Sequence, residues 1–177
     1  GQWRVIGRNI SDAAVQYRSL FNDVRIKIGK KYYYRVKARN TAGVSAASNI
    51  VGPVIAKRHA LIDEMADNLR TYDVSDGIKA KDRDTRKAKE DMHRLAGDKG
   101  QSITYKVRGA IDGFKVFAFF EGEIGMPVFS VSADGKNDTK INAKSENYYE
   151  VAGFEADAYG YYKPVLYRNA KVPAGTT

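Results

Sequence analysis

Tyrosines gather near the end of the sequence, where six of them fall within twenty residues. They are Tyr148, Tyr149, Tyr159, Tyr161, Tyr162 and Tyr167. Such rings can bind sugars, because flat patches of C–H groups on a sugar pack against an aromatic face while its hydroxyls bond polar neighbours. We expect a ligand platform built from one or two of Tyr148, Tyr149, Tyr159, Tyr161 and Tyr162. The alternative is that most of these rings lie in the core and at the edges of a sheet.

A run of mixed charge could bind acidic groups. Its bases are Lys79, Lys81, Arg83, Arg86, Lys87 and Lys89, and its acids are Asp82, Asp84, Glu90 and Asp91. Lys and Arg can hold the carboxylate of a uronic acid or a pyruvyl group through charge-assisted hydrogen bonds. We take Lys79 and Arg83 as candidate ligand-binding residues, and a solvated surface is the alternative.

Asp63 and Glu64, together with Asp67, could supply oxygens to a structural calcium ion, which takes six to eight of them. No spaced loop motif accompanies these acids. The chain contains no cysteine, which excludes disulfides and cysteine-based metal sites.

Catalytic signals are weak. Only two histidines occur, His59 and His93, and no motif places either one beside a nucleophile and an orienting group. A pair of carboxylates among 21 acids is always available and indicates nothing. Phosphate-binding loops and zinc-protease motifs are absent from the sequence. We therefore predict that the chain is not itself an enzyme.

The net charge of +9 is unevenly distributed. Residues 1–55 carry ten Lys or Arg against two acids, a net charge of +8, whereas residues 100–177 are neutral. Aromatic and basic residues interleave at 32–39, a pattern that can bind single-stranded nucleic acid. We do not expect that function, because the resemblance of residues 1–55 to a known family accounts for the same residues. No run of about 18 apolar residues exists to span a membrane.

The spacing of apolar residues predicts an all-β fold. Tyr32, Tyr34, Val36 and Ala38 alternate with Tyr33 and three basic residues, which is typical of a half-buried strand. Turn residues at 40–43 and an extended run over 44–54 follow. Ile103, Tyr105 and Val107 alternate in the same way, as do residues 114–120, and the run 128–132 leads into a turn at Ala133-Asp134-Gly135.

Two details of this pattern are open. On a strand, Tyr161 and Tyr162 face opposite ways, which predicts one ring in the core and one exposed. The composition of Lys79–Gly97 favours an exposed helix locally, so a helix is the alternative there.

The first part of the chain resembles the second half of a fibronectin type III domain, an immunoglobulin-like sandwich. The residues that carry this resemblance are Leu20, Gly29, Tyr32, Tyr34, Arg35, Val36, Ala38, Asn40, Gly43, Ser45, Ser48 and Asn49. It implies a partial domain over residues 1–55 and a linker over 56–62. Because the opening strands of that family are missing, we expect a cleaved fragment, or a second chain that completes the sandwich.

Residues 63–177 resemble the carbohydrate-binding β-sandwiches, of jelly-roll type, that are appended to bacterial mannanases, xylanases and xanthan-degrading enzymes. The matching segments are Ile62-Asp63-Glu64, Ile103-Thr104-Tyr105-Lys106, Ile111–Val116 with Phe119, Phe129–Gly135 and Val172–Thr176.

The resemblance implies a secreted, extracellular, non-catalytic module of a polysaccharide-degrading enzyme. Its expected partners are a polysaccharide, with an acidic one such as xanthan a candidate, and other domains or chains of the same enzyme. Two alternatives stay open: spacer modules that pack against a catalytic domain, and a fragment of a polysaccharide lyase or glycoside hydrolase.

Overall fold

The computed structural model describes residues 2–8, 21, 23, 25–58, 60–88, 93–147 and 160–176. Within these ranges every regular element is a β-strand and every strand pair is antiparallel, which confirms the all-β prediction. Contacts divide the chain into two compact units, a hairpin unit (residues 1–6 and 22–62) and a sheet unit (residues 7–21 and 63–177). The described residues include no helix that could cross a lipid bilayer.

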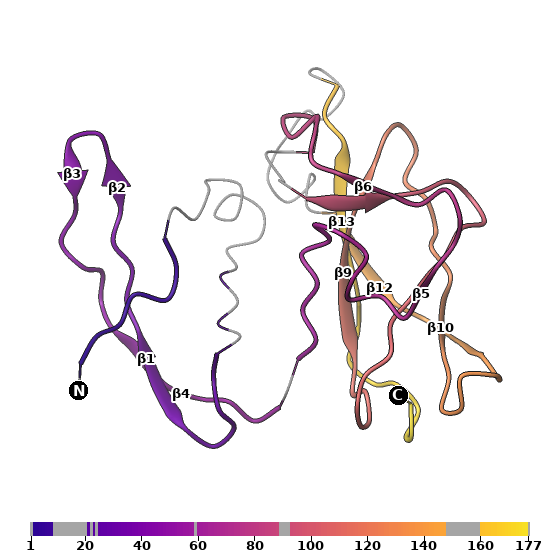
Figure 1. Cartoon of the computed structure of the whole chain (residues 1–177), viewed down its shortest axis with the longest axis horizontal. Helices are drawn as coiled ribbons and strands as arrows, with labels where there is room; N and C mark the ends of the chain where they lie inside the picture. Colours follow the sequence, from indigo (N-terminus) through magenta and orange to yellow (C-terminus); the bar gives the residue numbers. More distant parts are fainter. Residues whose placement is uncertain are drawn as a thin grey trace. The chain divides into compact units, whose positions relative to one another are not determined.

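The hairpin unit is built on β1 (Lys31–Tyr34) and β4 (Val51–Ile55), which pair antiparallel (Figure 1). The register shifts where Gly52 and Pro53 both lie opposite Tyr33, as in a β-bulge. A second pair, β2 (Arg39–Asn40) and β3 (Gly43–Val44), flanks the predicted turn. The Asn40 side chain accepts a 2.9 Å hydrogen bond from the Ala42 N–H inside this turn.

Two serine hydroxyls join these strand pairs. The Val36 N–H donates to Ser48 Oγ at 3.0 Å, and the Ala38 N–H donates to Ser45 Oγ at 2.9 Å. In return, the Ser48 and Ser45 N–H groups donate to the carbonyls of Val36 and Ala38, both at 2.9 Å. Val36 and Ala38 belong to the alternating stretch that predicts one strand, but they lie in the connection between β1 and β2. There the serine side chains take part in the hydrogen bonding in place of a regular ladder.

None of the described residues of the hairpin unit is buried. Tyr32 and Tyr34 are half-buried, and their hydroxyls are hydrogen-bonded to the Lys27 N–H (2.7 Å) and to Asp23 Oδ2 (3.2 Å). Farther along the hairpin, Val36 is 67% exposed and Val51 is 54% exposed. The described residues of this unit therefore form no core. An isolated two-stranded hairpin is only marginally stable in water, so the unit gains little stability from these residues alone.

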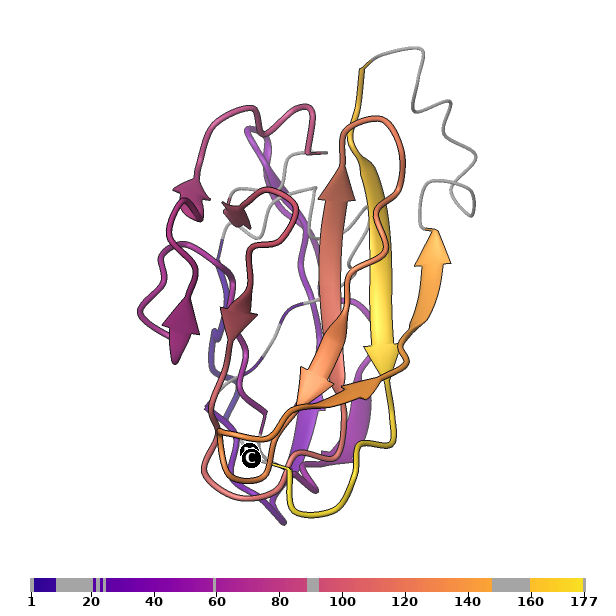
Figure 2. The ribbon, with the colours of Figure 1, turned by 90° about the vertical axis from the view of Figure 1, so that its right-hand side faces the viewer.

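The core of the sheet unit lies along β13 (Lys163–Asn169). Its residues 164–167 are buried, and the only other buried positions in the described ranges are Ala88 and Thr176. β13 pairs with β12 (Lys144–Asn147) on one edge and with β9 (Phe114–Phe120) on the other, and Figure 2 shows it between them. The Arg168 guanidinium is paired with the Glu146 carboxylate across the β12–β13 edge.

Aromatic rings pack beside β13. The Phe129 ring centroid lies 4.9 Å from that of Phe114 and 5.6 Å from that of Tyr167. Tyr167 also meets the ring of Phe120 edge-on, and its hydroxyl donates to the Gly125 carbonyl at 2.8 Å. Since Phe129 begins β10 (Phe129–Val131), which pairs with β11 (Thr139–Ile141), these rings hold that hairpin against the sheet.

The predicted turn after β10 is formed around Asp134. Its Oδ1 accepts hydrogen bonds from the N–H groups of Asn137 and Lys136, both at 2.8 Å, and its Oδ2 accepts one from Asn137 Nδ2 at 2.7 Å. These donors favour the charged form, so they hold the pKa of Asp134 well below its ordinary value. Gly135 follows with a φ of 70°, a conformation that glycine adopts readily.

Two short strand pairs complete the sheet unit. β5 (Asp73–Val74) pairs with β8 (Ile103–Thr104), and β6 (Lys79–Lys81) pairs with β7 (Arg94–Ala96). The alternative of a helix over Lys79–Gly97 is therefore wrong at both ends of that stretch. The described part of this stretch does contain one turn, in which the Ala88 N–H donates to the Asp84 carbonyl at 3.2 Å. The pairing of β6 with β7, at the two ends of the stretch, overrides the weak local propensity.

Candidate ligand-binding site

The segment that begins with β8 carries two exposed cations. From Ile103 to Arg108 the side chains alternate between half-buried and exposed, and Lys106 and Arg108 are exposed. Tyr105, which directly precedes Lys106, faces inward, where its hydroxyl donates to Asp63 Oδ2 at 2.8 Å. Burial, and then the bond to Asp63, raises the pKa of Tyr105 well above its ordinary value. The anchored Tyr105 therefore positions the main chain that carries Lys106.

Tyr72 reaches the same place from the neighbouring strand. The β5–β8 pairing continues past its last ladder residue, because the Tyr72 N–H donates to the Thr104 carbonyl at 2.7 Å. This bond brings the Tyr72 ring close to Lys106, whose ammonium lies 4.9 Å from the ring centroid. The Tyr72 side chain is 63% exposed. An aromatic surface with a cation beside it is thus available to solvent.

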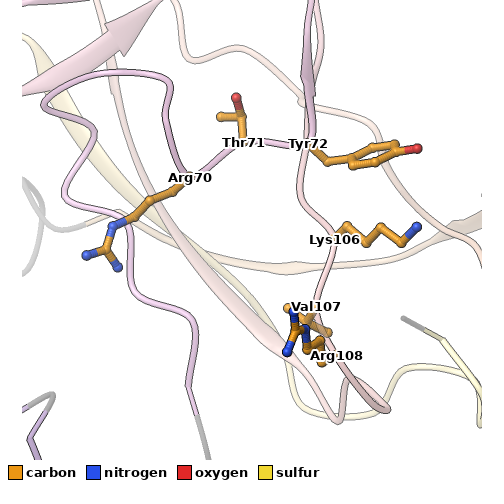
Figure 3. A pocket seen from close by; sticks show the side chains of 6 residues that line it. All are labelled: Arg70, Thr71, Tyr72, Lys106, Val107 and Arg108. Atoms are coloured by element: carbon orange, nitrogen blue, oxygen red, sulfur yellow. The ribbon is translucent and has the colours of Figure 1, made fainter.

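These residues line an open hollow of about 300 Å³. Its lining is Arg70, Thr71, Tyr72, Lys106, Val107 and Arg108. Figure 3 shows that the side chains of Tyr72 and Lys106 extend side by side in one direction, whereas Arg70 extends the opposite way. The volume is at the lower limit of small-ligand pockets, so the hollow fits one small group.

The hollow is lined by two kinds of side chain that bind ligands, an aromatic ring and cations. A tyrosine face packs against flat apolar patches, and Lys and Arg form charge-assisted hydrogen bonds with anions. A second hollow of about 330 Å³ surrounds the β2–β3 turn in the hairpin unit, and Arg39 is the one charged residue of its lining. The hollow at Tyr72 therefore offers the richer set of binding groups.

The predicted tyrosine platform is described only in part. Tyr148, Tyr149 and Tyr159 lie outside the described residues. Tyr161 and Tyr162 are both half-buried, and β13 begins only after them, so the alternation expected of a strand does not apply. The prediction of one buried and one exposed ring is therefore not met.

Tyr162 does meet the charged stretch that the sequence singles out. Its N–H donates to the Lys87 carbonyl at 2.8 Å, and the Lys87 ammonium lies 5.9 Å from its ring centroid. The Arg94 guanidinium lies 6.0 Å from the same centroid and donates to the Arg83 carbonyl at 2.6 Å. Arg94 thus links the Arg83 main chain to the Tyr162 ring. Lys79 lies in β6, where it pairs with Ala96.

The predicted calcium ligands make protein contacts. Asp63 Oδ1 accepts a 2.8 Å hydrogen bond from the Met65 N–H and its Oδ2 accepts the bond from Tyr105, while Glu64 is exposed. Within the described ranges, no three side chains of His, Asp or Glu are grouped as a metal site requires. Calcium binding by Asp63 and Glu64 stays a prediction.

Sequence reasoning missed Tyr72, Lys106 and Arg108. One signal was present, because the alternation of Ile103, Tyr105 and Val107 identifies the inner face and therefore places Thr104, Lys106 and Arg108 on the outer face. Nothing in the sequence indicates that Tyr72 lies beside them, since that depends on the pairing of β5 with β8.

No protein-family model, curated protein or solved structure matches the chain.

Proposed function

We propose that the chain is a non-catalytic accessory part of a secreted bacterial polysaccharide-degrading enzyme, and that it binds extracellular polysaccharide. The observation that carries this proposal is Tyr72, which is 63% exposed in an open hollow that Lys106 and Arg108 also line. Packing of a sugar on this ring holds the parent enzyme near its substrate and raises the local concentration of sites. A shallow hollow buries little ligand area, so each site binds weakly.

Local features support the finer fold assignment in this proposal. The Tyr32 hydroxyl bonds the main chain at Lys27, five residues upstream, as the tyrosine corner of fibronectin-like sandwiches does. In the sheet unit, the packing of the β10–β11 hairpin on β9 and β13 through Phe129 is compatible with a jelly-roll-like sandwich.

Isothermal titration of the full chain against neutral and acidic polysaccharides, xanthan among them, tests the proposal. We expect heat of binding with at least one polymer. Tyr72→Ala should weaken that binding about tenfold, because a stacked aromatic contributes about 1 to 1.5 kcal/mol. Tyr33→Ala is the matched control, since Tyr33 is also an exposed tyrosine, at 52%, but lies in the hairpin unit. Absence of heat with every polymer contradicts the proposal.

A second candidate function applies to the hairpin unit alone. The exposed Val36 and Val51, with no buried residue in the described part of the unit, favour a structural role in which another domain of the enzyme covers this apolar face. Hydrogen exchange of the isolated chain tests it. We expect the amides of β1 and β4 to exchange much faster than those of β13. Equal protection of both units contradicts the need for a further layer.

A further inference from the structure

Two of the three cations that line the hollow, Lys106 and Arg108, come from one short segment of the chain. Lys106 and Arg108 are two residues apart and both are exposed, so their Cα atoms are at most about 7 Å apart. The inward-facing Tyr105 and Val107 are half-buried on the other side and restrain this segment. The main chain therefore keeps the Cα atoms of Lys106 and Arg108 close together.

The aromatic surface next to these cations comes from a different strand. The Tyr72 ring lies beside Lys106 (Figure 3), whose ammonium is 4.9 Å from the ring centroid. Much of Tyr72 is exposed. A ligand that packs on this ring therefore has a positive charge within reach. Arg108 lines the same hollow and can bind a carboxylate with two parallel hydrogen bonds.

We infer that this hollow is a subsite for a sugar residue that carries a carboxylate. The ring of the sugar packs on Tyr72, and its carboxylate pairs with Lys106 and Arg108. A uronic acid and a pyruvyl ketal both present this chemistry. The inference rests on the proposed function and adds the class of residue that the polymer must contain.

The charge distribution favours a carboxylated sugar over a nucleic acid at this hollow. Residues 63–177 carry 18 Lys or Arg and 19 acids, a net charge of −1. Nucleic-acid binding draws on the neutralisation of many phosphates and on successive aromatic platforms. Two neighbouring cations and one exposed ring suit one anion on one sugar.

Titrations of the full chain with matched polymers test the inference. Polygalacturonate is compared with its methyl ester, which has the same backbone without the charge, and xanthan is compared with depyruvylated xanthan. The first pair tests a uronic acid and the second a pyruvyl ketal. We expect polygalacturonate to bind about tenfold more tightly than its methyl ester, or xanthan to bind about tenfold more tightly than depyruvylated xanthan, which lacks the ketal but keeps its uronic acid.

A charge-removing variant assigns this preference to the hollow. The double variant Lys106→Gln and Arg108→Gln should lose the preference and keep its affinity for the methyl ester within about twofold. The control is Lys115→Gln with Lys140→Gln, which removes the same charge from exposed positions on β9 and β11. Unchanged thermal unfolding of both variants shows that they fold.

Three outcomes separate the claims. Equal binding of both members of each pair, with the Lys106 and Arg108 variant unaffected, overturns the inference but leaves the proposed function standing. Absence of binding to any polysaccharide overturns both. Tighter binding of a single-stranded oligonucleotide than of any polysaccharide, lost in the same variant, overturns the inference in favour of nucleic acid.

Discussion

The Lys106 ammonium lies 4.9 Å from the centroid of the Tyr72 ring, although the two residues are 34 positions apart in the sequence. A cation over an exposed ring contributes about 0.5 to 1 kcal/mol, enough to favour one orientation of the Lys106 side chain without fixing it. The pair is therefore partly organised before any ligand arrives.

The first prediction separates the ring of Tyr72 from its hydroxyl. Tyr72→Phe keeps the aromatic face, so polysaccharide affinity should stay within about twofold of the wild type, whereas Tyr72→Leu should lose about five- to tenfold. Isothermal titration with the polymer that binds the wild type measures both. Equal affinities of the Phe and Leu variants would show that the aromatic face does not contact the sugar.

The second prediction concerns the anchor beneath the hollow. Tyr105→Phe removes the 2.8 Å hydrogen bond to Asp63 and should lower the free energy of unfolding by about 1 kcal/mol. Urea denaturation measures this, with Tyr72→Phe as an exposed control that should change stability by less than about 0.5 kcal/mol. No difference between the two variants would contradict the anchoring role.

The same residue predicts a dependence on alkaline pH. Because folding raises the pKa of Tyr105 above its unfolded value of about 10, the folded state holds this proton more tightly. Its contribution to stability is complete below about pH 10 and is lost as the pH rises further. Wild type should therefore lose more stability than Tyr105→Phe as the pH rises above about 10. The comparison between the two proteins is needed because burial also raises the pKa of Tyr34 and Tyr167.

Much of the fold is predictable because alternation is a local signal. The alternation of Ile103, Tyr105 and Val107 indicates an extended segment and its inner face. In the structure these three side chains are half-buried, as the alternation predicts. The stretch from Lys79 to Gly97 is harder, because its strands β6 and β7 are short and pair across intervening residues of helical composition. Local propensity cannot reveal that pairing.

The candidate site depends on the same non-local information. Tyr72 and Lys106 come together only because Asp73 pairs with Thr104 in the β5–β8 ladder. The prediction from sequence used clustering along the chain, which selects Tyr161 and Tyr162. Clustering along the chain differs from clustering in space whenever strands pair at long range.

The fourth prediction concerns Asp134 at acidic pH. The N–H groups of Asn137 and Lys136 lower the pKa of Asp134 in the folded state, so its contribution to stability is present above the unfolded pKa of about 4 and is lost as the pH falls further. Asp134→Asn should therefore show a shallower loss of stability below about pH 4 than wild type. The exposed Asp138→Asn, in the same connection, is the control. Parallel acid profiles for wild type and Asp134→Asn would contradict this role.

The last prediction concerns the two serines that join the strand pairs of the hairpin unit. Ser48 accepts the bond from the Val36 amide, and Ser45 accepts the bond from the Ala38 amide. A lost hydrogen bond is worth about 1 kcal/mol, so Ser48→Ala should accelerate hydrogen exchange of the Val36 amide about fivefold and leave Ala38 unchanged. Ser45→Ala should show the reverse pattern, and amide exchange measured by NMR makes each variant the control for the other. If both amides accelerate equally in both variants, the hairpin opens as one unit and the serine bonds are not independent.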